Sequence, residues 1–140
     1  MDCLFCKIIN KEIEASIVYE DDKCIVVLDI QPVNEGHTMV IPKGHYVTLA
    51  DCPDEIARHL MSVLKKFNVA VSKTVKCGGI FNAIMNGEEA QQEVFHLHLH
   101  IVPRSKGDGF DFIFPEKYGK VFPTRSELNN LAEKIKENSN

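Results

Sequence analysis

The amino-acid sequence predicts an α+β fold, in which a five-stranded antiparallel meander sheet carries one long helix and short helices near the two ends of the chain. Five short apolar runs bounded by turn residues are typical of strands, and residues 51–76 repeat apolar side chains at helical spacing. The elements follow as short helix, three strands, long helix, two strands and terminal helix. With 140 residues, 44% of them hydrophobic, we expect one domain spanning residues 1–140.

The first half of the chain supplies a short helix and three strands. Residues 5–11 carry apolar side chains at helical spacing, which predicts one or two helical turns. Residues 21–23 are a polar turn between two strand-like runs, and the Pro and Gly of residues 31–36 indicate a loop. Pro42 should end the strand that follows this loop. The strands predicted here are residues 17–20, 24–29 and 37–41.

The long helix begins near Asp51, a candidate N-cap, with Pro53 in its first turn and acidic residues where the helix dipole favours them. Gly78 and Gly79 end it. Its apolar stripe comprises Ile56, Leu60, Val63, Leu64, Phe67, Ala70 and Val71.

Two strands and a terminal helix complete the predicted fold. The strands are expected at residues 80–85 and 94–104, on either side of a turn. Thr124 and Glu127 form a capping-box pattern, which predicts that a helix begins there. Its apolar stripe is Leu128, Leu131 and Ile135.

Composition argues against several classes of partner and location. The net charge is −4, and basic and acidic residues are interspersed, so we expect neither a nucleic-acid nor a membrane partner. The first residues do not resemble a signal peptide, and no apolar run is long enough to span a bilayer, which favours a cytoplasmic protein. Five cysteines are an odd number, and together with the missing signal this disfavours a disulfide framework.

Three histidines alternate along the last predicted strand. Because successive side chains of a strand point to opposite faces, His96, His98 and His100 should share one face, while the apolar residues between them enter a core. A solvated polar face usually mixes Thr, Lys, Glu and Ser instead. The pattern therefore indicates a functional site.

The alternating histidines are compatible with two kinds of site. They could converge on a metal ion, or they could hold one nucleophilic imidazole with helpers beside it. Two charged neighbours ~7 Å apart would repel by ~2 kcal/mol at an effective dielectric near 20, so at least one ring should be neutral at pH 7. A neutral imidazole has the lone pair that either role requires.

A second motif makes the pattern more specific. Residues 36–43 read GHTMVIPK, and with HLHLH at residues 96–100 they resemble the histidine triad (HIT) family of nucleotide hydrolases and transferases. The similarity is greatest to the small purine-nucleoside phosphoramidases and related prokaryotic proteins. It covers residues 3–104 and leaves 105–140 as a C-terminal extension. It implies a HIT-like fold and a homodimer. In this dimer the long helix and the strand at residues 80–85, which would otherwise be an exposed apolar edge, pair across a two-fold axis to form a continuous ten-stranded sheet.

The resemblance implies covalent catalysis by a histidine. His98 would attack the α-phosphorus of a purine nucleoside phosphoramidate or related conjugate, forming a nucleotidyl-imidazole that water hydrolyses. His37 would orient the nucleophile and stabilise the cation formed on attack. His100 would donate to the non-bridging phosphate oxygens, and no metal is needed for the chemistry.

The resemblance also implies a purine nucleotide of the AMP or GMP type as ligand. Asp29 would accept hydrogen bonds from the ribose hydroxyls, and Gln92 and His100 would contact the nucleotide. The apolar purine pocket would comprise Leu4, Phe5, Ile8, Val27 and Ile30.

A structural zinc site is expected beside the triad. Cys3 and Cys6 have the Cys-x2-Cys spacing, and with His45 and His96 they form a set suited to tetrahedral zinc. Several HIT proteins of this branch bind zinc in this way. His96 would then serve the metal and leave His98 free for catalysis.

Two alternative functions stay open. Met85 and Gln91 stand where the family usually has an amide and a glycine, which would suit a nucleotide-binding interaction module with little or no catalysis. A zinc hydrolase that uses the triad itself as the metal site is the other alternative, although the nearby acidic residues form no familiar ligand spacing.

Overall fold

The computed structural model describes residues 2–139, which fall into two compact units divided after Phe110. The first contains all five strands, and the second contains helix α3 (Arg125–Glu137). Residues 105–110 belong to the first unit, although the sequence assigned them to the extension, because Asp108 binds Arg104 through two hydrogen bonds of 2.7 and 3.0 Å. No helix among the described residues is long and apolar enough to cross a membrane.

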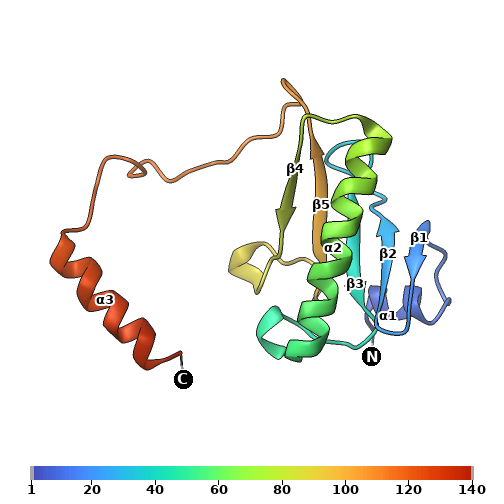
Figure 1. Ribbon diagram of the computed structural model, residues 1–140, viewed down its shortest axis with the longest axis horizontal. Coiled ribbons are helices and arrows are strands. Elements are labelled where there is room, and N and C mark those ends of the chain that lie inside the picture. The colour runs from blue at the N-terminus through green and yellow to red at the C-terminus, as the bar shows by residue number, and fades with distance from the viewer. Residues whose placement is uncertain (1, 140) are drawn as a thin grey trace. The chain divides into compact units, whose positions relative to one another are not determined.

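The sheet is antiparallel throughout, which confirms the predicted fold class, but its strand order differs from a simple meander (Figure 1). The order is β1-β2-β3-β5-β4, so β5 lies between β3 and β4 and is antiparallel to both. The long helix α2 (Asp54–Val75) causes this arrangement, because it returns the chain to the end where β3 began and makes β4 parallel to β3. The strands are β1 (Ile17–Glu20), β2 (Cys24–Leu28), β3 (Thr38–Pro42), β4 (Gly79–Ala83) and β5 (Leu99–Arg104).

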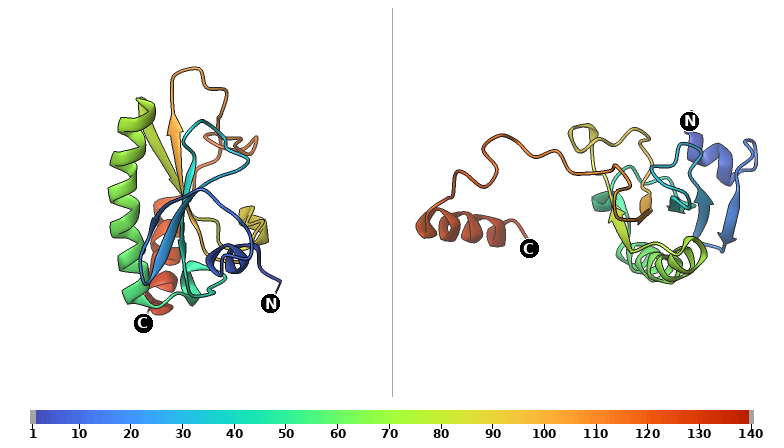
Figure 2. Two further views of the ribbon diagram at one scale, coloured as in Figure 1. Left: turned by 90° about the vertical axis from the view of Figure 1, so that its right-hand side faces the viewer. Right: turned by 90° about the horizontal axis from the view of Figure 1, so that it is seen from above.

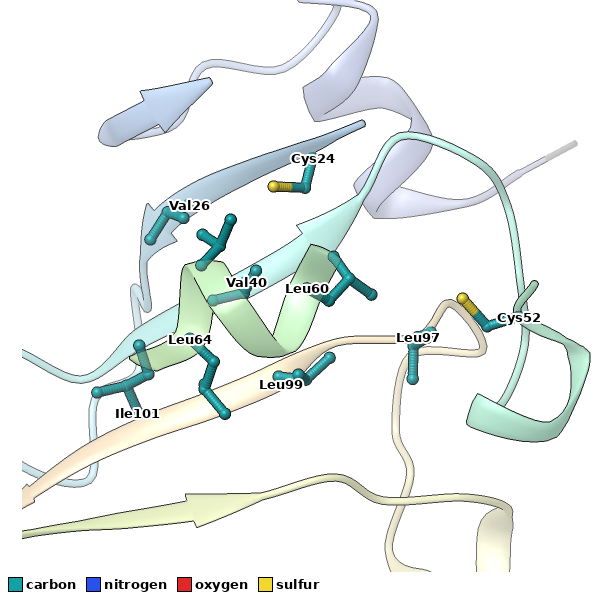
Figure 3. Close-up of a cluster of buried hydrophobic side chains, with 10 residues drawn as sticks. Cys24, Val26, Val40, Cys52, Leu60, Leu64, Leu97, Leu99 and Ile101 are labelled. Atoms are coloured by element: carbon teal, nitrogen blue, oxygen red, sulfur yellow. The ribbon is translucent and has the colours of Figure 1, made fainter. Parts of the chain in front are cut away.

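Both faces of the central strands β2, β3 and β5 are buried, because α2 covers one face of the sheet and α1 (Leu4–Ile9) lies on the other (Figure 2). Leu60 and Leu64 of α2 face Val26, Val40 and Leu99, as Figure 3 shows. The alternate residues of β2 and β3 pack under α1 with Phe5 and Ile8. The two-sided burial explains why these strands read as continuous apolar runs.

The α2 helix keeps its predicted apolar stripe except at Ala70, which is exposed, and its start differs from the prediction. Asp51 lies in a 3₁₀ turn, where its carboxylate accepts from the backbone N–H and the hydroxyl of Thr48 at 2.8 and 2.7 Å. Pro53 is the N-cap of α2, and the helix ends at Lys76, which adopts a left-handed conformation with φ 53°. The helix begins later than predicted because the carboxylate of Asp51 caps the 3₁₀ turn and is not available to cap α2.

Asp21 fastens the β1–β2 hairpin to α2. Its carboxylate accepts from the backbone N–H groups of Lys23 and Cys24, each at 2.8 Å, and from the Tyr19 hydroxyl at 2.9 Å. It also lies 2.7 Å from His59 Nε2 on α2. These hydrogen bonds hold the pKa of Asp21 well below its ordinary value, although burial opposes the shift. His59 therefore has a structural partner.

The left-handed helix end gives a stability prediction. Replacing exposed Lys76 by Gly should stabilise the protein by about 0.5–1 kcal/mol, because only the Cβ makes this conformation costly. Thermal unfolding should show a melting temperature about 2–4 °C higher. Lys76→Ala keeps the Cβ and serves as the control; an equal rise in both variants would contradict the explanation.

Candidate active site

The predicted alternation of the histidine motif holds, although β5 begins only at Leu99. His96 and His98 precede the strand because β3 ends at Pro42, which has no N–H to extend the ladder. The Pro42 carbonyl instead lies 2.9 Å from Nε2 of His96. Leu97, Leu99 and Ile101 enter the core under α2 as expected, and the three histidines are buried.

His98 is held in one neutral form by its own backbone. Its Nδ1 lies 2.7 Å from the His96 carbonyl oxygen, which only accepts, so Nδ1 carries the proton and Nε2 carries a lone pair. The Phe5 ring packs edge-on against the imidazole at 5.1 Å between centroids. This is the protonation state that a nucleophilic histidine requires.

A chain of hydrogen bonds places the proton of His100 on Nε2, the nitrogen that carries the lone pair in His98. The backbone N–H of Val33 donates to Nδ1 of His37 at 3.1 Å, so the proton of His37 resides on Nε2. That Nε2–H donates to Nδ1 of His100 at 2.8 Å, which places the proton of His100 on its own Nε2. Among the described residues, no group lies within hydrogen-bonding distance of this buried Nε2. His100 thus keeps a donor available for a ligand.

Burial keeps these rings neutral. It is the largest cause that lowers the pKa of His37 and His98, although the Asp29 charge opposes it in both. The pKa of His100 falls to about 4, because the effect of burial is reinforced by His98 and His37. The rings are close, with centroids 4.7 Å apart for His98 and His100.

The His37 ring contacts His100 in this structure. Its Nε2 donates to Nδ1 of His100, whereas the His96 carbonyl lies beside Nδ1 of His98. The predicted role of His37 in orienting the nucleophile stays a prediction. The observed contact is with His100, which is expected to donate to the phosphate oxygens.

Asp29 lies just beyond β2 and joins this cluster. Its Oδ2 is 3.5 Å from Nδ1 of His37, and its Oδ1 accepts from the Gln31 backbone N–H at 2.8 Å. The Asp29 N–H also donates to the His37 carbonyl at 2.9 Å. The predicted ribose-binding carboxylate and the predicted catalytic histidines are thus adjacent.

The other predicted nucleotide-binding residues are in different environments. Phe5, Ile8 and Val27 are packed in the core under α1, whereas Leu4 is 42% and Ile30 is 89% exposed. The side chain of Gln92 is buried, and its amide bonds only to backbone: it accepts from the N–H of residue 87 at 2.8 Å and donates to the carbonyls of residues 47 and 94 at 2.6 and 3.1 Å. In this structure Gln92 braces the turn before the triad.

Cys3, Cys6, His45 and His96 gather as the sequence predicts, with one ligand atom of each within 4.8 Å of the others. Because Nε2 of His96 donates to the Pro42 carbonyl, its Nδ1 lone pair faces the two thiols. The distances from Nδ1 to Sγ are 3.4 Å for His96 and Cys3, 3.6 Å for His96 and Cys6, and 3.4 Å for His45 and Cys6.

This cluster fits tetrahedral zinc. Typical Zn–S and Zn–N bonds of about 2.3 and 2.05 Å at a tetrahedral angle separate sulfur from nitrogen by about 3.5 Å, and the three observed distances bracket this value. Two thiols and two imidazoles also match the metal's ligand preference. Burial is the largest cause that raises the pKa of the Cys6 thiol, so loss of its proton would need such a cation.

Comparison with known proteins identifies the family. A model described as the HIT domain matches residues 10–107. An uncharacterized HIT-like protein of Borreliella burgdorferi is 44% identical over 138 residues, which cover 97% of this chain and 92% of that protein. The chain belongs to the HIT family.

Solved HIT structures share the fold. A HIT family protein from Bacillus anthracis is 38% identical, with a TM-score of 0.90 over 99% of this chain and 98% of that one. A zinc-bound histidine triad family protein from Mycobacterium smegmatis is 37% identical, with a TM-score of 0.75 over 96% and 98%. Adenosine 5′-monophosphoramidase HNT1 of Saccharomyces cerevisiae is 40% identical over 103 residues, which cover 73% of this chain and 62% of that enzyme.

Sequence reasoning missed the backbone and loop groups around this HIT site. The N–H of Val33 and the carbonyl of His96 determine which ring nitrogens carry protons, yet any residue type could supply them. Asn34 and Asp108, which bond to each other at 2.9 Å, were also missed. The signal in the sequence that could have indicated them is the charged pair of Arg104, the last residue of β5, and Asp108 in the Gly-rich stretch that follows.

The buried imidazoles predict acid instability of this HIT protein. The pKa of His100 is lower when folded, so the unfolded chain binds more protons below pH 6.5, and stability falls from there to about pH 4. His100 alone should contribute at most about 3.5 kcal/mol to the loss, since each pKa unit corresponds to about 1.4 kcal/mol. Melting temperatures measured across this range should decline less steeply in His100→Gln. Parallel curves for both proteins would refute this assignment.

Proposed function

We propose that this HIT protein is a nucleotide hydrolase or nucleotidyl transferase that cleaves the α-phosphate bond of purine nucleoside phosphoramidates or related conjugates. One observation carries the proposal: neighbouring histidines present Nε2 atoms of opposite character, a lone pair on His98 and an unpaired N–H on His100. A nucleophile beside a hydrogen-bond donor suits displacement at an anionic phosphorus. The yeast relative named as a phosphoramidase supports the substrate class.

The first displacement uses the lone pair of His98. Nε2 forms a bond to the α-phosphorus while the bond from phosphorus to the leaving nitrogen or oxygen breaks, and the leaving group takes the electron pair and a proton from solvent. The imidazole becomes cationic but keeps its Nδ1 proton, and the His96 carbonyl at 2.7 Å stabilises this charge. Water then attacks the same phosphorus and loses a proton to solvent, while the bond from phosphorus to Nε2 breaks and its electron pair returns to the ring. This step releases the nucleoside monophosphate and restores His98.

His100 acts on the phosphate oxygens. Charge builds on these oxygens as the phosphorus is attacked, and a preorganised donor in a buried site stabilises it at little reorganisation cost. The buried Nε2–H of His100 is such a donor. His37 fixes its orientation through the 2.8 Å hydrogen bond.

Asp29 and the surface beside α1 bind the nucleoside in this proposal. The carboxylate of Asp29 accepts from the ribose hydroxyls, and exposed Leu4 and Ile30 offer apolar surface to the base. Phe5, Ile8 and Val27 support that surface from the core. Gln92 holds the turn in front of the triad.

Zinc in the Cys3, Cys6, His45 and His96 cluster serves structure in this proposal. When bound, the ion joins α1 to the segments that carry His45 and His96, and so substitutes for a small hydrophobic contact area. His96 then has two tasks, because its ring faces the thiols while its carbonyl holds the nucleophile.

We also propose that two chains associate through β4. It is an edge strand of the five-stranded sheet, and it presents half-buried Ile80 and Phe81. An apolar edge strand is an aggregation hazard unless it is covered. Antiparallel pairing of β4 with its copy would produce a continuous ten-stranded sheet.

The geometry disfavours one alternative and leaves the other to experiment. Among the described residues, the ring nitrogens of His96, His98 and His100 do not form one ligand group, so the triad is a poor zinc hydrolase site. Gln91 occupies the left-handed conformation usual for glycine, with φ 64°. Because Gln91 has a side chain where the family usually has glycine, the turn before the triad differs from the usual one. This difference is the observation that favours a nucleotide-binding module without catalysis.

Trapping the covalent intermediate tests the proposed function. The protein is incubated with an adenosine phosphoramidate that carries radioactive α-phosphorus. Label bound through an acid-sensitive bond should be found on the native protein and be absent from His98→Asn. Turnover should fall by at least about 1,000-fold in that variant, because the nucleophile is lost. His59→Asn, which changes a histidine outside the site, should turn over normally.

Two results would count against this function. Normal turnover by His98→Asn would exclude the covalent mechanism. Calorimetric AMP binding by the native protein, without turnover of any nucleoside phosphoramidate, would favour the binding module.

Metal content tests the zinc proposal. Chelated protein should take up one zinc ion per chain, with a higher melting temperature, since a ligand that binds only the folded state stabilises it. Cys6→Ser should weaken uptake, whereas Cys77→Ser, a change outside the cluster, should not. Full zinc uptake by a Cys3→Ser/Cys6→Ser double variant would show that the metal binds elsewhere.

A further inference from the structure

The hydrogen bond between His37 and His100 can run in either direction. In the structure Nδ1 of His37 accepts from Val33, so His37 donates to His100. If Nδ1 carried the proton instead, it could donate to Asp29 Oδ2, which lies 3.5 Å away. Nε2 of His37 would then accept from His100, and Nε2 of His100 would present a lone pair to the substrate rather than a donor.

The position of the Val33 N–H decides between these two arrangements. Its 3.1 Å distance to Nδ1 makes a good hydrogen bond, whereas 3.5 Å to Asp29 is long. Val33 lies in the loop between β2 and β3, and its side chain is exposed, so packing of that side chain does not hold it in place. Other contacts must hold the β2–β3 loop in this position.

Asn34 anchors the loop at the next residue. Its backbone carbonyl accepts from the His37 N–H at 3.0 Å, which closes a turn of residues 34–37 directly after Val33. Its side-chain Nδ2 donates to the Pro103 carbonyl at 2.7 Å and to Asp108 Oδ2 at 2.9 Å. The loop is thus tied to the end of β5 and to the segment after it.

Asp108 is itself held firmly. It accepts from Arg104 Nε and Nη2 at 2.7 and 3.0 Å, and from the backbone N–H groups of Ser105 and Phe110, each at 3.1 Å. Its side chain is only 9% exposed. The Arg104 guanidinium is the main cause that holds the pKa of Asp108 well below its ordinary value, so the group is a charged acceptor.

We propose that Asn34, anchored by Asp108, is a positioning residue that sets the direction of the His37–His100 hydrogen bond and thereby makes His100 a donor toward phosphate. The tie from Asn34 to Asp108 holds Val33 in place, Val33 determines the proton position on His37, and His37 determines it on His100. The catalytic consequence rests on the proposed function, but the proton positions do not.

Nitrogen-15 NMR of the imidazoles, on protein without substrate, tests the proton positions. In the native protein, His37 and His100 should carry their protons on Nε2 and His98 on Nδ1. Asn34→Ala should shift His37 and His100 toward the Nδ1–H form and leave His98 unchanged, because the His96 carbonyl stays in place. Glu35→Ala, an exposed change one residue along the loop, should alter none of them.

Kinetics give the second readout. Loss of the His100 donor should lower kcat of Asn34→Ala for an adenosine phosphoramidate by about tenfold, with KM changed less than about twofold, since the donor acts mainly on the transition state. If Asn34→Ala does not fold, Asp108→Asn carries the test, because a neutral amide cannot keep all these hydrogen bonds. The same proton shift is expected in that variant.

The outcomes separate the two proposals. A folded Asn34→Ala or Asp108→Asn protein with native proton positions on His37 and His100 would overturn the role of Asn34. Native protein with the expected proton positions but no turnover would leave this inference standing and reject the proposed function. An Asn34→Ala protein whose proton positions shift while the Glu35→Ala control stays native would support it.

Discussion

The burial of several imidazoles in one cluster is the constraint on which the site depends. Charging any of them costs desolvation, and charging two neighbours adds repulsion, so the rings stay neutral. A neutral imidazole has one donor and one acceptor, which forces each ring to choose a tautomer. Backbone groups make that choice, because the carbonyl of His96 accepts and the N–H of Val33 donates. The chemical difference between His98 and His100 follows from these two fixed contacts.

His96 contacts both the cysteines of the metal-ligand cluster and the nucleophile His98. Its Nδ1 faces the thiols, its Nε2 donates to the Pro42 carbonyl, and its own carbonyl accepts from His98. The ring is fully buried, and Phe5 packs against it at 5.8 Å between centroids and against His98. A displacement of α1 would therefore move the packing contact of His98 as well as the cysteine ligands.

The parts of the fold that depend on local pattern were predictable from the sequence. The apolar stripe of α2 and the alternation of Leu97, Leu99 and Ile101 with the histidines follow from residue spacing alone. The insertion of β5 between β3 and β4 was not predictable in this way, because it depends on where α2 returns the chain. The sequence identified the residue types of the site. It could not show which ring nitrogen of each histidine carries the proton, because that depends on distances to backbone atoms, which every residue type possesses. Asp108 was missed because its hydrogen bond from Asn34 forms only when the β2–β3 loop meets the segment after β5, whereas its other four hydrogen bonds are local to residues 104–110.

The strand order has a consequence for the order in which the molecule assembles. β5 is the last strand in the chain, yet it occupies an interior position and pairs with both β3 and β4. During synthesis, the earlier strands and α2 emerge before β5 exists, and two gaps in hydrogen bonding stay open until it inserts. Contacts between β3 and β5 span about sixty residues, and loop closure of that length is slow to form. The histidine cluster therefore needs β5 in place between β3 and β4, because His37 precedes β3 and His100 lies on β5.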